Sequence, residues 1–364
     1  MRDRLRSCEN GYDVSGQASS GSPDDEPALD DSLLVHDRET LSRIRRCSKQ
    51  ALQRHSLRPD GFETRYALGR KVGEGMHSVV YECFQAGDEK RQRPFAVKVS
   101  REDDEEKKMA HRREFKLTRQ LDHPNLVNSY EFFENEFTGE IHLVMNLFKG
   151  VELFDLLAEE KPLTEMEAKV IAKQMVDALA YLHKSHIVHR DLKPQNILIS
   201  EDRVVQIIDF NVSRKFNSSQ PKLMTKTGSP EYSAPEMLSQ TTYDHKVDVW
   251  SAGVVLYQIL CGKPLFADEN IAKLVQDIQT RDLTKAIASI PKVSEQAKQL
   301  LASMLERDPS KRFSAEKCLQ SPWLADIDLS KIQPRMAQAD RPVTSRIIES
   351  TTAFKDFDYS HEEA

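Results

Sequence analysis

Apolar residues come in short runs between residues 66 and 145 and at helical spacing after residue 150. The short runs are rich in β-branched and aromatic residues, which favour strands. A highly charged segment between the third and fourth run predicts a helix. The pattern therefore predicts strands at 66–72, 78–83, 94–99 and 140–145 and a helix at 101–121.

Beyond residue 150 the apolar positions recur every three to four residues, as on one face of a helix. Strands first and helices afterwards predict an α+β fold of two lobes with a cleft between them. The expected helices are 152–158, 165–183, 248–261, 271–279, 294–306 and 314–319.

The two ends of the chain differ from this middle part. Residues 1–36 are rich in Ser, Gly, Asp and Pro and carry too little apolar surface to order themselves. Residues 38–56 predict a basic amphipathic helix, with Leu41 and Ile44 on its apolar face. The expected organisation is an extension at 1–65, one folded domain at 66–324 and a mostly flexible tail at 325–364.

Composition excludes several classes of protein. The chain has 364 residues and a net charge of -6, which argues against nucleic acid as a partner. No apolar run is long enough for a membrane span. Its five cysteines are scattered, so they indicate reduced intracellular thiols rather than a zinc site or disulfides. A cytoplasmic location is expected, with the nucleus not excluded.

One run of polar residues carries recognisable chemistry. The segment from His189 to Asn196 is followed by Asp209-Phe-Asn, so two carboxylates, an amide and a lysine lie within about twenty positions. A metal-assisted transfer of the γ-phosphoryl group of ATP needs such a set. Asp191 can accept the proton of an attacking hydroxyl, and Lys193 can neutralise charge on the phosphate. Asn196 and Asp209 can hold Mg²⁺.

A second group of residues suits phosphate binding. Gly73-Glu-Gly75 separates the first two strands, and glycines allow the backbone to approach an anion closely. Lys98 lies in an otherwise apolar strand, where an unpaired charge is costly. A glutamate of the following helix is its expected partner; the resemblance described next points to Glu114, with Glu105 or Glu106 as the alternative.

These motifs together resemble the domain of the eukaryotic protein kinases. Lys193 is typical of the serine/threonine branch, and Ser78 and the segment 113–125 are similar to the calcium/calmodulin-dependent group. The resemblance implies a bilobal fold with one main helix beside an antiparallel sheet, and a mainly helical second lobe. It assigns ATP contacts to Val72, Gly73, Glu74, Gly75, Ser78, Val80, Ala96, Lys98, Glu114, Met145, Asn146, Phe148, Glu152 and Leu198.

The same resemblance implies regulation and substrates. The segment from Asp209 to Glu236 resembles an activation segment, in which Thr225 and Thr227 are candidate phosphorylation sites. Ser48 follows two arginines and is a candidate for autophosphorylation; phosphopeptide mapping after incubation with MgATP tests it. Expected partners are proteins with Ser or Thr in a weakly basic context. Calmodulin and an upstream activating kinase stay open as further partners.

The chain departs from the family at Asn211, where the family has glycine. Asn tolerates positive φ better than other non-glycine residues, so we expect strain there on the order of 1 kcal/mol, too little to stop metal binding. The alternative interpretation is a pseudokinase that serves as a binding scaffold.

Overall fold

The chain divides into residues 1–59 and 60–364, and all described residues lie in the second unit. The computed structural model describes residues 61–75, 78–159, 162–216, 229–239 and 242–329. The helix predicted near 38–56, most of the predicted tail and the candidate phosphosites Ser48, Thr225 and Thr227 lie outside these residues.

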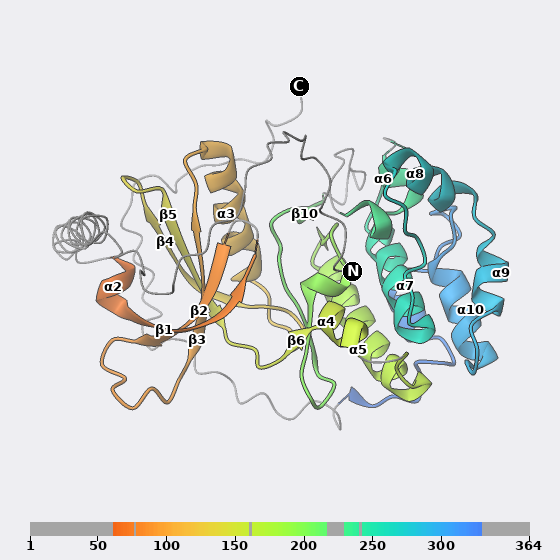
Figure 1. Cartoon of the computed structure of the whole chain (residues 1–364), viewed down its shortest axis with the longest axis horizontal. Helices are drawn as coiled ribbons and strands as arrows, with labels where there is room; N and C mark the ends of the chain where they lie inside the picture. The colour runs from red at the N-terminus through yellow and green to blue at the C-terminus, as the bar shows by residue number, and fades with distance from the viewer. Residues whose placement is uncertain (1–60, 76–77, 160–161, 217–228, 240–241, 330–364) are drawn as a thin grey trace, which may run out of the picture. The chain divides into compact units, whose positions relative to one another are not determined.

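The N-terminal lobe is an antiparallel sheet with one long helix beside it (Figure 1). Its strand order is β1-β2-β3-β5-β4, so β3 lies in the middle. The predicted strands are present, whereas β4 was missed. The elements are β1 (Tyr66–Glu74), β2 (Ser78–Gln85), β3 (Phe95–Arg101), α3 (Glu105–Thr118), β4 (Ser129–Asn135) and β5 (Glu140–Asn146).

The long helix α3 starts four residues later than predicted. The strand β3 runs through Arg101, and the side chain of Asp104 caps the helix by accepting a hydrogen bond from the Glu106 N–H at 2.8 Å. A cap of this kind satisfies one of the open N–H groups of the first turn. The boundary therefore follows the capping residue rather than the charge pattern.

Aromatic residues form the core on one face of the sheet. The turn α2 (Phe62–Arg65) precedes β1, and its Phe62 is buried in a cluster with Phe95, Val97 and Val144. The Phe62 ring stacks on His142 with a centroid distance of 4.4 Å. The packed residues therefore begin before Tyr66, where the sequence predicted the domain to start.

The C-terminal lobe is mainly helical, and its core is continuous with the residues around the cleft. A capping box between Thr164 and Glu167 starts α5, and α7 is buried along most of its length. The short helices α6 and α9 were not predicted, because they have too few residues to show a period. The helices are α4 (Leu153–Glu159), α5 (Glu165–Lys184), α6 (Pro235–Leu238), α7 (Lys246–Cys261), α8 (Ile271–Thr280), α9 (Leu283–Ala288), α10 (Glu295–Met304) and α11 (Ala315–Leu319).

Short strands and turns connect the lobes and carry the polar residues singled out in the sequence. The strands β6, β8 and β9 form one small sheet, and β7 and β10 form another. These elements are β6 (Val151–Glu152), β7 (Ile187–Val188), η1 (Pro194–Asn196), β8 (Ile197–Ile199), β9 (Val205–Ile207), β10 (Arg214–Lys215) and η2 (Pro230–Tyr232). None of the described helices is long and apolar enough to cross a bilayer. The predicted bilobal α+β fold is confirmed.

Candidate active site

The loop between β7 and β8 presents Asp191 to the cleft. Its carboxylate accepts a hydrogen bond from the Asn196 amide at 3.0 Å and pairs with the Lys193 ammonium at 2.9 Å. The Asn196 amide nitrogen also donates to the Asp191 carbonyl oxygen at 2.8 Å, which closes the loop on itself. Three residues predicted to act together therefore lie in one hydrogen-bonded group.

A buried carboxylate from α7 holds this loop from behind. Asp248 accepts hydrogen bonds from the backbone N–H groups of His189 and Arg190 at 2.9 and 2.8 Å, and its side chain meets His183 at 2.9 Å. Burial would raise the pKa of Asp248, but these hydrogen bonds and the His183 ring lower it below its usual value. The brace fixes Arg190 at a φ of 70°, which a non-glycine residue rarely adopts.

Lys98 lies on β3 and points toward α3. Its ammonium is 3.3 Å from both carboxylate oxygens of Glu114, which is 4% exposed. Glu105, an alternative partner in the sequence, instead pairs with Arg112 at 2.6 Å. Burial would lower the pKa of Lys98, but the carboxylates of Glu114 and Asp209 raise it above its usual value. Lys98 is therefore charged and able to meet an anion.

Asp209 completes the group from the other side of the cleft. Its Oδ1 lies 3.5 Å from the Lys98 ammonium and is buried without accepting a hydrogen bond from the described part of the chain. Burial pushes the pKa of Asp209 upward, but Lys98, His189 and the Asn211 backbone N–H hold it below the usual value. A buried, ionised oxygen without a donor is the group that a hard divalent cation seeks. The Asp209 carboxylate therefore fits the role of a metal ligand that the sequence predicts for it.

The prediction of a strained backbone at Asn211 is wrong. Asp209 has a φ of 65°, whereas the φ of Asn211 is not positive. The Asn211 backbone N–H instead helps to hold the Asp209 carboxylate. The conformational cost in this turn thus lies at the metal-binding position, which is aspartate in the family as well. Nothing in the backbone therefore penalises asparagine at position 211.

The hairpin of β1 and β2 carries the glycine-rich loop. The Gly75 N–H donates to the Ser78 carbonyl at 2.8 Å, and a Cβ at Gly73 would meet nothing within 4 Å. Met76 and His77, between them, lie outside the described residues. Val80 lies directly opposite Lys98 in the sheet. The loop is thus close to the lysine that would share its phosphates, and Val72 and Glu74 flank it on β1.

The predicted adenine contacts lie where the lobes join. Ala96 is opposite Met145 in the sheet, and Leu198 is opposite Glu152. The Asn146 N–H already donates to the Asn128 carbonyl at 3.0 Å, so this N–H does not face a nucleotide. Phe148 follows β5 in the connection between the lobes. The pKa of Glu152 is raised by burial and by Asp155, although Lys193 opposes this.

Ser229 is a site residue that the sequence reasoning missed. Its backbone N–H donates to the Asp191 carboxylate at 2.9 Å, and its hydroxyl accepts from the Lys193 ammonium at the same distance. It lies 38 positions from Asp191 in the chain, and only the fold joins them. The position of Ser229 just before Ala234-Pro-Glu236, which resembles the end of an activation segment, was a signal that could have directed attention to it.

Comparison with known proteins agrees with this geometry. Residues 66–324 match the family model of the protein kinase domain. A probable myosin light chain kinase of Dictyostelium discoideum is 37% identical, over 74% of this chain and 85% of that protein. Calcium-dependent protein kinase 4 of Plasmodium berghei is 39% identical, over 58% of this chain and 40% of that protein.

A further Dictyostelium protein with the same name is 32% identical and covers 87% of this chain and 90% of its own length. Kinases of this family use ATP and a divalent cation and act on proteins. The chain therefore belongs to the protein kinase family, as a serine/threonine kinase that resembles the calcium/calmodulin-dependent group.

Proposed function

We propose that this chain is an active serine/threonine kinase that transfers the γ-phosphoryl group of MgATP to hydroxyls of intracellular proteins. The observation that carries the proposal is a pair of charged groups, one around Lys98 and one around Asp191, with Lys193 near enough to help lower the pKa of Asp209. Lys98 lies 3.5 Å from Asp209, and Asp191 lies 3.0 Å from Asn196 and 2.9 Å from Lys193. The residue types that binding, metal coordination and proton transfer require are all present in these two groups.

The side chains divide the reaction between them. Lys98, held by Glu114, would bind the nonreacting phosphates, and Asp209 and Asn196 would hold Mg²⁺. When bound, the metal neutralises charge on the phosphate oxygens. As the substrate oxygen bonds to the γ-phosphorus and the bond to ADP breaks, Asp191 accepts the hydroxyl proton. Lys193 lies beside that carboxylate and stabilises negative charge on the phosphate in transit.

Asn211→Gly tests the pseudokinase alternative. Because Asn211 has an ordinary φ and an exposed side chain, restoring the family glycine should change the rate of phosphate transfer by less than roughly threefold. The rate is measured with labelled ATP and a generic basic protein. If the wild type showed only a trace of phosphate transfer and Asn211→Gly raised the rate at least about tenfold, the pseudokinase interpretation would be favoured.

Substrate preference follows from charge around the cleft. Glu152 and Glu231 would attract basic residues near the target hydroxyl, while Gln195 stands where an acidic residue would strengthen that attraction. Relatives named myosin light chain kinase and calcium-dependent protein kinase suggest a role in signalling. Calmodulin binding, which a calcium-dependent pull-down tests, and phosphorylation of Thr225, Thr227 or Ser48 stay predictions.

Transfer of label from γ-labelled ATP to a basic protein substrate tests the proposed function as a whole. The expected result is incorporation on serine or threonine that requires Mg²⁺. Incorporation on neither residue, with a folded protein, would exclude an active serine/threonine kinase.

A further inference from the structure

Glu102 is a buried carboxylate just after β3, in the connection to α3. It is 9% exposed, and its backbone N–H donates to the Gly139 carbonyl at 2.9 Å. A Cβ at Gly139 would lie 2.4 Å from the Glu102 carbonyl oxygen, so the connection is packed tightly against the turn between β4 and β5. A buried carboxylate is costly unless it has charged partners. The groups that surround the Glu102 carboxylate therefore indicate which part of the structure it holds in place.

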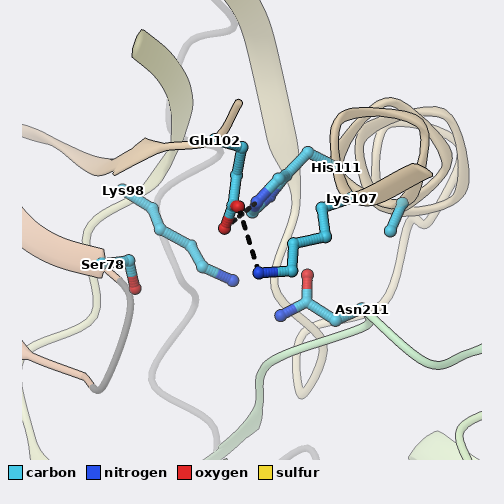
Figure 2. A pocket seen from close by; sticks show the side chains of 7 residues that line it. Ser78, Lys98, Glu102, Lys107, His111 and Asn211 are labelled. Carbon is cyan, nitrogen blue, oxygen red and sulfur yellow. Dashed lines mark ion pairs between the residues drawn. The ribbon is translucent and has the colours of Figure 1, made fainter. Parts of the chain in front are cut away.

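Those partners come from the first half of α3. The Glu102 carboxylate lies 3.5 Å from the Lys107 ammonium and 4.0 Å from Nε2 of His111, as the dashed lines in Figure 2 show. On the other side of the ring, Nδ1 of His111 lies 3.8 Å from Glu114. Because His111 is only 12% exposed, this part of the network is sheltered from solvent. The His111 ring thus lies between Glu102 and Glu114, the carboxylate that holds Lys98.

Apolar packing does not secure the same part of the helix. The buried residues of α3 are Glu114, Leu117 and Thr118, all in its second half. The first half faces a pocket of about 180 Å³, which the side chains of Ser78, Lys98, Glu102, Lys107, His111 and Asn211 line (Figure 2). Polar contacts must therefore hold this half in place.

Two sets of polar contacts act on different sides of α3. Arg112 forms a bidentate pair with Glu134 of β4, at 2.8 and 2.7 Å, and ties the helix to the edge of the sheet. The Glu102 contacts act on the side of the pocket, next to Lys98. The Glu102 contacts, unlike the Arg112–Glu134 pair, lead through His111 to the Lys98–Glu114 pair.

We propose that Glu102 is a positioning residue, which holds the first half of α3 through Lys107 and His111 and thereby keeps Glu114 on Lys98. The inference rests on the proposed function for its effect on catalysis, but the position of α3 does not depend on activity. The effect of Glu102 should appear in the turnover number and in the protection of α3 together.

Glu102→Gln removes the charge and keeps the size of the side chain. We expect kcat to fall roughly 10- to 100-fold with little change in KM for the protein substrate, because a misplacement of about 1 Å can cost that much. Amide hydrogen exchange over 105–118 should become at least roughly threefold faster, while α7 keeps its protection. The matched control is Asp103→Asn, an exposed carboxylate next to Glu102, which should change neither quantity.

The two readouts separate the possible failures. Unchanged exchange over 105–118 in Glu102→Gln would overturn the proposal, whatever the activity. Faster exchange in a chain whose wild type transfers no phosphate would support the positioning role and exclude the proposed function. Faster exchange with an unchanged kcat would contradict the link between Glu102 and the Lys98–Glu114 pair.

Discussion

Asp191→Asn is expected to lower the rate of phosphate transfer on the order of 10²–10⁴-fold while the affinity for ATP stays within about threefold. Asparagine keeps the shape of the side chain but cannot take the hydroxyl proton. The donors from Asn196 and Lys193 both meet Oδ2 and can still bind an amide oxygen there, whereas the Ser229 N–H loses its acceptor. The measurement is kcat with a basic protein substrate, beside the dissociation constant for ATP.

Asp202→Asn is the matched control for this prediction. Asp202 is an exposed aspartate in the turn between β8 and β9, so the same chemical change there should leave both quantities unaltered. Full transfer by Asp191→Asn would refute the role of Asp191 as the base. A loss of ATP binding together with transfer would show instead that the substitution had disturbed the cleft.

Arg312→Met is expected to destabilise the chain by about 3–5 kcal/mol, because it leaves a buried carboxylate without its partner. The guanidinium is buried and forms two hydrogen bonds with Glu236, at 2.6 and 3.0 Å. It also lies 5.2 Å from the centroid of the Trp250 ring and donates to the Glu306 carbonyl. Methionine fills similar space, so most of the loss should come from the lost pairing between Arg312 and Glu236.

Urea unfolding followed by far-UV circular dichroism measures this loss. Lys311→Met is the control, because that side chain is 73% exposed and should change stability by less than about 0.5 kcal/mol. Adding Glu236→Gln to Arg312→Met should recover part of the loss, since the double variant buries no lone charge. A change below about 1 kcal/mol in Arg312→Met would mean that the pair contributes little to the lobe.

The sequence predicted the residues proposed to carry out the reaction better than the residues that hold them in place. Lys98 stood out as a charge in an apolar strand, and Asp191 and Asn196 share one short loop, so local patterns were enough to select them. Ser229 reaches Asp191 through a contact between distant segments, which no local pattern contains. Glu102 looked like one of many acids at the start of a charged helix, and only its burial distinguishes it.

Backbone conformation was the other quantity that the sequence could not supply. The strain expected at Asn211 lies at Asp209 instead, because the position of that carboxylate is set by its contacts across the cleft. The strand β4 was missed although aromatic residues Phe132 and Phe133 lie in it. Its residues are mostly half-buried at the edge of the sheet, so their pattern of apolar and polar positions is weak.

The dissociation constant for ATP, measured by calorimetry with and without Mg²⁺ on the wild type and on Asp209→Asn, tests the central claim most directly. If Lys98, Asn196 and Asp209 enclose a metal–nucleotide complex, Mg²⁺ should tighten binding to the wild type by at least about tenfold and binding to Asp209→Asn much less. A folded wild-type chain that binds no ATP, or binds it equally well with and without Mg²⁺ in both proteins, would contradict the account.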